Sequence, residues 1–221
     1  MCEKYFVPLL TNWLNQMVKV KLEKTTEEKI LLAAKKVFIH KGMSGARMQD
    51  IADEAGINKA MLHYYFRNKQ KLFEVIFLEA AEKLFPAINE VFESDTPLFE
   101  KIENFCDRYI SIMSENPFLP LFVLNEISRD PVTFFSKIWG KQTVPRPHKF
   151  LEQIEREVKK GYIIRISPIQ LLMNLVSMTI FPFVAKEMFK YNMQIDEMQF
   201  RAIMEQRKKE IPKFIIQSIK K

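Results

Sequence analysis

The residues with the clearest chemical potential lie between Glu54 and Glu74, where the chain carries no acidic residue. Four basic residues fall in this window: Lys59, Arg67, Lys69 and Lys71. Lys and Arg neutralise the phosphates of nucleic acids, and a carboxylate among them opposes that contact. An acid-free window of 19 residues is unexpected in a chain with 27 Asp and Glu residues. The segment is therefore predicted to face nucleic acid; the simpler alternative is a solvated helix face that carries two aromatic rings.

Two short helices joined by a glycine turn have to position this segment. An apolar stripe at helical spacing marks the first helix: Met48, Ile51, Ala52 and Ala55. Gly56 tolerates the left-handed conformation that ends a helix, and Asn58 is a favourable N-cap for the next one. The second helix, 59–66, is predicted to bury Leu62, Tyr65 and Phe66 and to turn Lys59, Ala60, Met61, His63 and Tyr64 outward. This is the pattern of a helix-turn-helix, whose second helix enters the major groove of DNA.

From about Thr25 to Phe77 the chain resembles the DNA-binding domain of the tetracycline-repressor (TetR) family of bacterial transcription regulators. The residues that carry the resemblance are the apolar run 30–38, Gly42, Ile51-Ala52, Ala55-Gly56, Leu62, Tyr65-Phe66 and Lys69. The chain departs from the family pattern at Ala46, Arg47, Asn58, Ala60 and His63. These departures affect individual contacts and the target sequence rather than the fold. The rest of the chain resembles the family in helical layout more than in motif.

The resemblance implies DNA-contacting roles for nine residues. Lys59, Ala60 and Met61 are expected to meet base edges, with Gln49 as a fourth candidate. Arg47, His63, Tyr64 and Lys69 are expected to hold phosphates, and Asn58 completes the set. The chemistry agrees, because Lys pairs with guanine O6 and N7, while Ala and Met side chains touch thymine methyl groups. The alternative for Tyr64 is a ring in the core.

Composition and charge favour an all-α protein with an N-terminal DNA-binding part. Of the 221 residues, 48% are apolar, which is enough to form a hydrophobic core. Only five are glycines, which argues against a fold rich in strands or loops. Of the net charge of +7, residues 1–77 carry +5 (13 basic, 8 acidic) and 78–221 carry +2 (21 basic, 19 acidic). We expect an N-terminal extension over 1–24, a helix-turn-helix domain over 25–70, and a helical effector-binding and dimerisation domain over 71–221.

The extension over 1–24 lies outside the resemblance and has three interpretations. It is an extra helix on the body, a DNA-groove arm that uses Lys19, Lys21 and Lys24, or an artefact of start-codon choice, since Met17 also opens a plausible protein. No membrane segment is expected: the longest apolar run, 171–185, has 15 residues, fewer than the ~20 needed to span a bilayer. Cys2 and Cys106 have no metal or redox spacing, so a cytoplasmic location is predicted.

Beyond residue 77 the periodicity and the prolines predict further helices. Their expected ranges are 98–113, 118–128, 148–160, 168–190 and 197–219, with a loop over 140–147. Pro97 is expected to precede the first of these helices, Gly161 to end the third and Asp196 to cap the last. The last two helices carry more apolar surface than one amphipathic face needs. Core packing is one explanation. A homodimer interface is the other, and the resemblance supports it, because the TetR family builds its dimer from its last two helices.

The resemblance also implies a small-molecule effector, and the chain is rich in soft and aromatic side chains, with 19 Phe and 12 Met. Eight residues are predicted to line a cavity for a small apolar or aromatic ligand: Phe105, Tyr109, Met113, Phe122, Trp139, Met173, Met178 and Phe181. Binding cavities are mostly apolar with few polar groups. Plain core packing is the alternative for each of these residues.

No catalytic, cofactor or metal constellation is found in the sequence. The histidines at positions 40, 63 and 148 are isolated, and no glycine-rich phosphate loop or nucleophile elbow occurs. The predicted function is a homodimeric transcriptional regulator, a ligand-responsive repressor that binds a palindromic double-stranded DNA operator. The alternative is a helical carrier of hydrophobic small molecules without DNA binding, which explains the apolar core but not the acid-free basic helix. A non-specific nucleic-acid-coating protein fits less well, because the charge is modest and localised.

Overall fold

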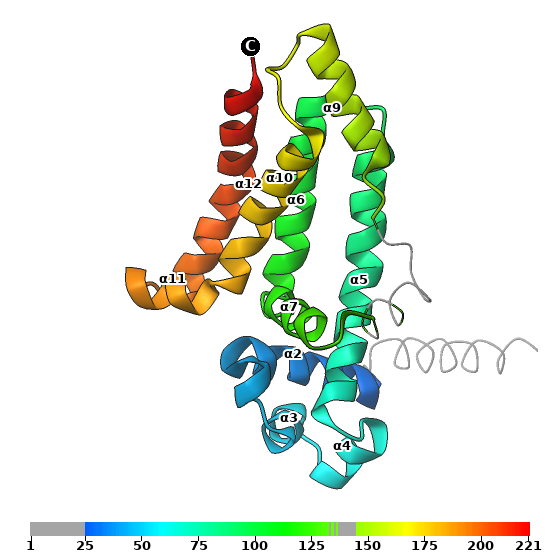
Figure 1. The fold of residues 1–221 in the computed structure, drawn as a ribbon. Helices are drawn as coiled ribbons and strands as arrows, with labels where there is room; N and C mark the ends of the chain where they lie inside the picture. Colours follow the sequence, from blue (N-terminus) through cyan, green and yellow to red (C-terminus); the bar gives the residue numbers. More distant parts are fainter. Residues whose placement is uncertain (1–24, 133, 135, 137–144) are drawn as a thin grey trace, which may run out of the picture. The chain divides into compact units, whose positions relative to one another are not determined.

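The computed structural model describes residues 25–132, 134, 136 and 145–221 (Figure 1). These residues form helices and no strand; one isolated bridge pairs Ile163 with Lys220. The predicted all-α class is therefore confirmed. The predicted extension over 1–24, Trp139 and most of the predicted loop over 140–147 lie outside the described residues. The chain divides into two compact units at Glu74/Val75, and each is described by itself.

Over residues 25–74, the first unit contains three helices and the start of a fourth. They are α2 (Thr26–Gly45), α3 (Met48–Ala55), α4 (Lys59–Tyr65) and the first residues of α5 (Lys69–Glu93). A capping box begins α2, in which the Thr25 Oγ1 accepts from the Glu28 N–H and the Glu28 carboxylate accepts from the Thr25 N–H. The core contains Phe38 of α2 and Phe73 of α5, whose rings meet edge to face at 5.0 Å.

Among its described residues, the second unit contains the rest of α5 and six further named helices. They are α6 (Leu98–Glu115), α7 (Leu119–Arg129), α9 (His148–Lys160), α10 (Pro168–Val184), α11 (Lys186–Met193) and α12 (Glu197–Ile219). Helices α6, α10 and α12 lie side by side (Figure 1). Three predicted boundaries are confirmed: Pro97 precedes α6, Gly161 ends α9 with φ 75°, and the Asp196 carboxylate accepts from the Gln199 N–H at the start of α12.

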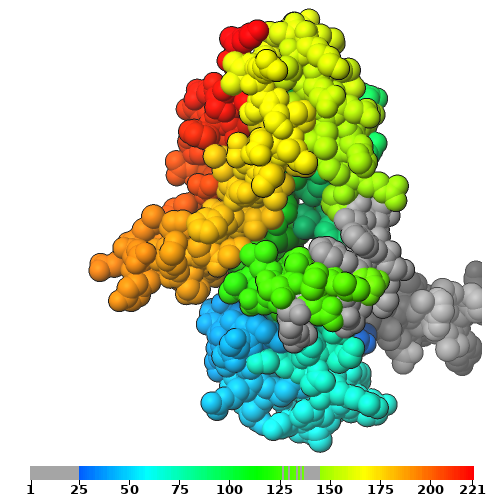
Figure 2. Space-filling model, viewed as in Figure 1, coloured from blue at the N-terminus to red at the C-terminus, as the bar shows by residue number. Residues whose placement is uncertain are grey.

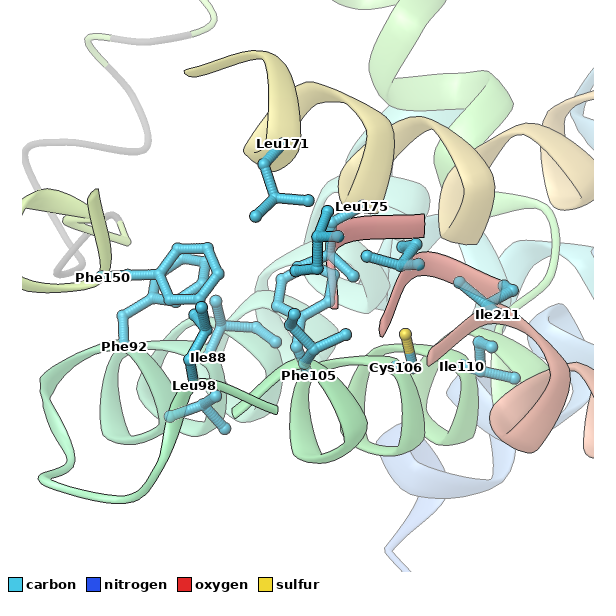
Figure 3. Packing of buried hydrophobic residues seen from close by; sticks show 14 of the residues in the cluster. Ile88, Phe92, Leu98, Phe105, Cys106, Ile110, Phe150, Leu171, Leu175 and Ile211 are labelled. Atoms are coloured by element: carbon cyan, nitrogen blue, oxygen red, sulfur yellow. The ribbon is translucent and has the colours of Figure 1, made fainter. Parts of the chain in front are cut away.

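Aromatic rings and branched aliphatic side chains from five helices form the core of the second unit (Figure 3). The Phe92 ring of α5 stacks on Phe105 of α6, with ring centroids 5.6 Å apart, and on Phe150 of α9 at 5.2 Å. Leu175 of α10 and Ile211 of α12 are buried in the same cluster. Fully burying side chains of this size contributes about 1.5–3 kcal/mol each, so this cluster holds the helices of the second unit together.

The prediction of one helix over 168–190 is wrong, because α10 and α11 are separate helices bent by 65° at Ala185. Pro182 lies in the last turn of α10 and has no N–H, so the Met178 carbonyl four residues earlier has no helical donor. Helices often kink or end at such a position. Among the described residues, no single helix is long and apolar enough to span a membrane. Taken together, α10 and α11 have the required length and composition, but they are bent relative to each other.

A side chain from another helix replaces the donor that Pro182 lacks. Arg207 of α12 donates from Nη2 to the Met178 carbonyl oxygen at 2.9 Å. The guanidinium is half-buried, and its desolvation lowers the pKa of Arg207. Its Nε has no hydrogen-bond partner among the described residues. The Arg207 contact thus joins α12 to the bend of α10.

We expect Arg207→Met to lower the free energy of unfolding by about 1–3 kcal/mol, because it leaves the Met178 carbonyl unpaired at a half-buried position. Chemical denaturation measures this loss. The control is Arg201→Met on the same helix, which removes an exposed group with a 3.7 Å ion pair to Glu197 and should cost under about 0.5 kcal/mol. In a Pro182→Ala background, where the backbone regains an N–H at this position, Arg207→Met should cost less; equal costs in both backgrounds contradict the account.

Candidate functional site

The turn between α3 and α4 has the predicted geometry. Gly56 adopts the left-handed conformation, φ 68° and ψ 32°, which strains any residue with a Cβ. The N–H of Ile57 donates to the Ala52 carbonyl at 3.0 Å, which closes the end of α3. Asn58 then caps α4, with its Oδ1 accepting from the Met61 N–H at 2.7 Å. These contacts fix the direction in which α4 leaves α3.

Helix α4 has one buried side and one exposed side. Leu62 and Phe66, one turn apart, are buried in the first unit. The exposed side chains include five of the predicted DNA-contacting residues: Lys59, Ala60, Met61, His63 and Tyr64. Tyr64 is 84% exposed, which rules out its alternative role as a core ring.

The predicted burial of Tyr65 is wrong, because this residue is 42% exposed. Leu62 and Phe66 already occupy the side of α4 that faces the core. Tyr65 lies on the edge of that side, and its ring meets the Tyr64 ring edge to face at 5.4 Å. Its hydroxyl therefore stays in contact with water, as a tyrosine hydroxyl without a buried partner should.

The carboxylates of α3 are engaged by neighbouring polar and basic groups. The Lys41 ammonium lies 2.9 Å from Asp50, and the Lys36 ammonium lies 2.8 Å from Glu54. Hydrogen bonding to these lysines holds the pKa of both carboxyls below its usual range. Asp53 accepts a hydrogen bond from the Gln49 amide at 2.8 Å, so Gln49 is oriented from its own helix. The negative charge of α3 is thus largely compensated.

Two of the exposed basic residues in the acid-free window have no carboxylate partner among the described residues. Within the part of the chain that the structure describes, neither Lys59 nor Arg67 forms an ion pair, and both are exposed. Arg67 was not assigned a contact from the sequence, although it lies in the same acid-free window. The ring of His63 is tied to the next turn, with its Nδ1 3.0 Å from the Arg67 carbonyl oxygen. If Nδ1 donates there, Nε2 donates to a phosphate only when the ring is protonated.

The Lys69 ammonium donates to two backbone carbonyls near the end of α2. Its Nζ donates to the Met43 carbonyl at 2.6 Å and to the Ala46 carbonyl at 2.9 Å, and the residue is half-buried. Both carbonyls lie at the end of α2, beyond its break at Gly42, where φ is 64° and ψ is 173°. Lys69 therefore caps this end of α2 with two of its three N–H donors, and its predicted phosphate contact stays a prediction.

The second unit contains a cavity of about 390 Å³, walled by α5, α6, α7 and α10 with Pro145 and Pro147. Figure 2 shows the surface hollowed between α7 and α10. Of the predicted ligand-contacting residues, Phe105, Tyr109 and Met113 line the cavity. The α5 lining, including Phe77 and Phe85, was missed, because sequence periodicity does not tell an apolar side chain on a cavity wall from one in a filled core.

Four predicted cavity residues lie elsewhere. Phe122 is buried, with its ring centroid 6.4 Å from that of Phe77. Met173 and Phe181 are 56% and 53% exposed on the outer side of α10, and Met178 packs against the hydrophobic core. Trp139 lies outside the described residues. Among the residues that are described, no group of His, Cys, Asp and Glu side chains is arranged to hold a metal ion.

These features define an all-helical protein with an N-terminal helix-turn-helix and a larger helical unit that contains an apolar cavity. Residues 30–76 match the family model of bacterial regulatory proteins of the tetR family. This segment of the chain, which contains α3 and α4, is therefore similar to the DNA-binding domain of that family. The fold agrees: a crystal structure of a mutant HlyIIR protein has a TM-score of 0.59 at 23% identity, covering 88% of this chain and 97% of that one. The structure of ketosteroid transcriptional regulator KstR2 of Mycobacterium tuberculosis has a TM-score of 0.65 at 12% identity, and the match covers 90% of this chain and 97% of that one.

Similarity in sequence to individual relatives is concentrated in part of the chain. The HTH-type transcriptional repressor NicS of Pseudomonas putida is 37% identical over 65 residues, which are 29% of each chain. The HTH-type transcriptional activator FasR of Mycolicibacterium smegmatis is 29% identical over 87 residues, 39% of this chain and 40% of FasR. The matches therefore span less than half the length of these two relatives.

We expect Lys69→Met to lower the free energy of unfolding by about 2–3 kcal/mol, because two carbonyls lose a charged donor at a half-buried site. The matched control is Lys71→Met on the same helix, which removes an exposed ion pair with Glu74 and should cost under about 0.5 kcal/mol. Urea denaturation of the full chain measures both. Similar small losses for the two variants contradict the capping role.

Proposed function

We propose that this protein is a DNA-binding transcriptional regulator, a cytoplasmic homodimer that represses transcription from a palindromic operator. The observation that carries the proposal is the exposed side of α4, where basic and aromatic residues face solvent with no carboxylate between Glu54 and Glu74. A solvated helix face has no need to exclude acids. The match of residues 30–76 to the tetR family model and the names of NicS and FasR support the same role.

Base contacts are assigned to the first turn of α4. Lys59 donates to guanine O6 and N7, and the Ala60 and Met61 side chains touch thymine methyl groups. Gln49 on α3 is a fourth base-reading candidate. Arg47, Asn58, His63, Tyr64 and Lys69 stay in the proposed interface, and Arg67 is added to it as a phosphate contact. Phosphate contacts position the protein on DNA, whereas base contacts specify the sequence.

Exposed apolar side chains on the last helices support the homodimer. They include Ile169, Met173, Phe181, Met188, Tyr191, Met198 and Phe214. Ile169, Met173 and Phe181 recur along one side of α10, with Ser177 between the last two. An apolar face of this kind marks an interaction surface. A two-fold interface supplies the second recognition helix that a palindromic operator requires.

Regulation by a ligand is part of the proposal, with the cavity as the effector site. Helix α5 carries residues of both units, with Leu72 and Phe73 in the core of the first and Phe77 and Ile88 on the cavity wall. A ligand that favours one conformation of α5 changes DNA affinity by its differential binding free energy, for which about 1–3 kcal/mol is typical. Repression is proposed over activation because occupying a promoter suffices for it, although the relatives include an activator.

A carrier of hydrophobic molecules is the second candidate, because the cavity by itself fits that function. It leaves the exposed basic side of α4 unexplained. DNA binding separates the two, since a carrier without a DNA role shows no preference for the DNA upstream of its own gene over a shuffled duplex of equal length.

Base-reading and phosphate-holding roles predict different effects of substitution. Lys59→Ala should cost about 1–3 kcal/mol at one base pair of each half-site and spare random DNA. Arg67→Ala should weaken binding to all sequences and reduce the slope of log K against log salt by about 0.9 for each phosphate that is no longer neutralised. Fluorescence anisotropy over a salt series measures both.

The control for these variants is Lys83→Ala, an exposed lysine of the second unit that should leave DNA binding unchanged. If Lys59→Ala weakens specific and random DNA equally, its base-reading role is wrong.

Introducing a charged side chain tests the proposed dimer surface on α10. Met173→Glu and Phe181→Glu each place a carboxylate in the proposed interface and should raise the dimer dissociation constant by more than about tenfold. Tyr162→Glu is the control, because Tyr162 is equally accessible but follows α9. Sedimentation equilibrium measures the constants. A monomeric unmodified protein at micromolar concentration contradicts the proposal.

A further inference from the structure

The chemistry of the cavity wall restricts the ligand more than its volume does. Among the side chains of described residues on this wall, only that of Tyr109 carries an oxygen or nitrogen atom. No Lys, Arg, His, Asp or Glu is among them. A charged ligand group inside therefore has no charged partner among the described residues of the wall, and burying an unpaired charge costs several kcal/mol.

Tyr109 is placed to make one hydrogen bond. Its ring stacks on Phe105, with centroids 5.8 Å apart and 17° between the planes, so the ring is held in place. The residue is half-buried, and its hydroxyl bonds to no other residue that the structure describes. Burial raises the pKa of Tyr109, which keeps the hydroxyl neutral. A neutral hydroxyl donates one hydrogen bond or accepts one.

The backbone of the wall adds few donors for an anion. The N–H groups in the middle of α5, α6 and α10 are used within the helices. In the non-helical part of the wall, Pro145 and Pro147 have no N–H, and the intervening Arg146 N–H donates to the Asn89 Oδ1 at 2.9 Å. At the start of α7, the Leu119 N–H donates to the Asn116 carbonyl at 3.1 Å, and Pro120 has no N–H.

We infer that this cavity binds an uncharged, mainly hydrocarbon molecule with one hydroxyl or carbonyl group, which hydrogen-bonds to Tyr109. Carboxylates, phosphates and amines are excluded as buried ligand groups. The volume of about 390 Å³ lies within the range of small-molecule sites, about 300–1,000 Å³. The inference deepens the proposed function and rests on it in one respect, that the bound molecule acts as an effector.

Four probes of one chain length test the ligand class on the full chain without DNA. They are 1-decanol, 2-decanone, decanoate and decylamine, at about pH 7.5, where the acid and the amine are charged. Calorimetric titration and thermal unfolding should show binding of the two neutral probes, and at least about tenfold weaker binding of the charged ones. Decanoate or decylamine binding as tightly as 1-decanol overturns the inference, and so does failure of both neutral probes to bind.

Tyr109→Phe tests the hydrogen bond. It should weaken 1-decanol and 2-decanone about 2- to 10-fold and leave naphthalene, which has no polar group, unchanged. If Tyr109 were only structural, all three probes would weaken together. Val123→Trp on the wall should block every probe, whereas Leu121→Trp, an exposed position of the same helix outside the wall, should block none.

A DNA titration separates the failure of this inference from the failure of the proposed function. If the neutral probes bind as expected but leave the affinity for the upstream DNA unchanged, the ligand class stands and the effector role is wrong. If the protein shows no preference for the upstream DNA, the proposed function as a transcriptional regulator is wrong, while the four probes still decide the ligand class.

Discussion

Free backbone carbonyls at the ends and breaks of helices impose the constraint on which much of this structure depends. Each buried carbonyl needs a donor, and here long cationic side chains from other helices supply it. Lys69 donates to the carbonyls of Met43 and Ala46. The buried Lys101 donates to the Phe92 carbonyl at 3.0 Å, and Arg207 donates to the Met178 carbonyl. A cation at a helix C-terminus also opposes the partial negative charge there. Each contact therefore fixes one helix end against a second helix.

The direction in which the exposed side of α4 faces follows from this constraint. Lys69 holds the residues just before α3, and Leu62 and Phe66 bury one side of α4 in the same unit. With that side committed to the core, the opposite side with Lys59 and Tyr64 has to face solvent. The lysines that pair with Asp50 and Glu54 further reduce the negative charge of α3. The structure thus exposes basic groups on α4, while two of the three carboxylates of α3 are paired with lysines.

The sequence predicted the features that local chemistry determines. Gly56, Asn58, Pro97, Gly161 and Asp196 marked helix ends correctly, because turn and cap preferences depend on a few adjacent residues. The missed and misjudged features depend on distant residues. The bend at Ala185 and the roles of Lys69 and Arg207 require knowledge of which carbonyls lack helical donors and which helix lies near. Met173 and Phe181 were placed in the cavity because apolar character does not tell the inner side of α10 from its outer side.

The central claim is that the exposed side of α4 reads a specific DNA sequence in two copies. Hydroxyl-radical footprinting of the purified protein on the DNA upstream of its own gene tests this most directly. The account predicts two protected half-sites of inverted sequence, with centres about 34–36 Å or a multiple of one helical turn apart. Protection spread evenly along the DNA, or no protection at concentrations where the protein is dimeric, contradicts it.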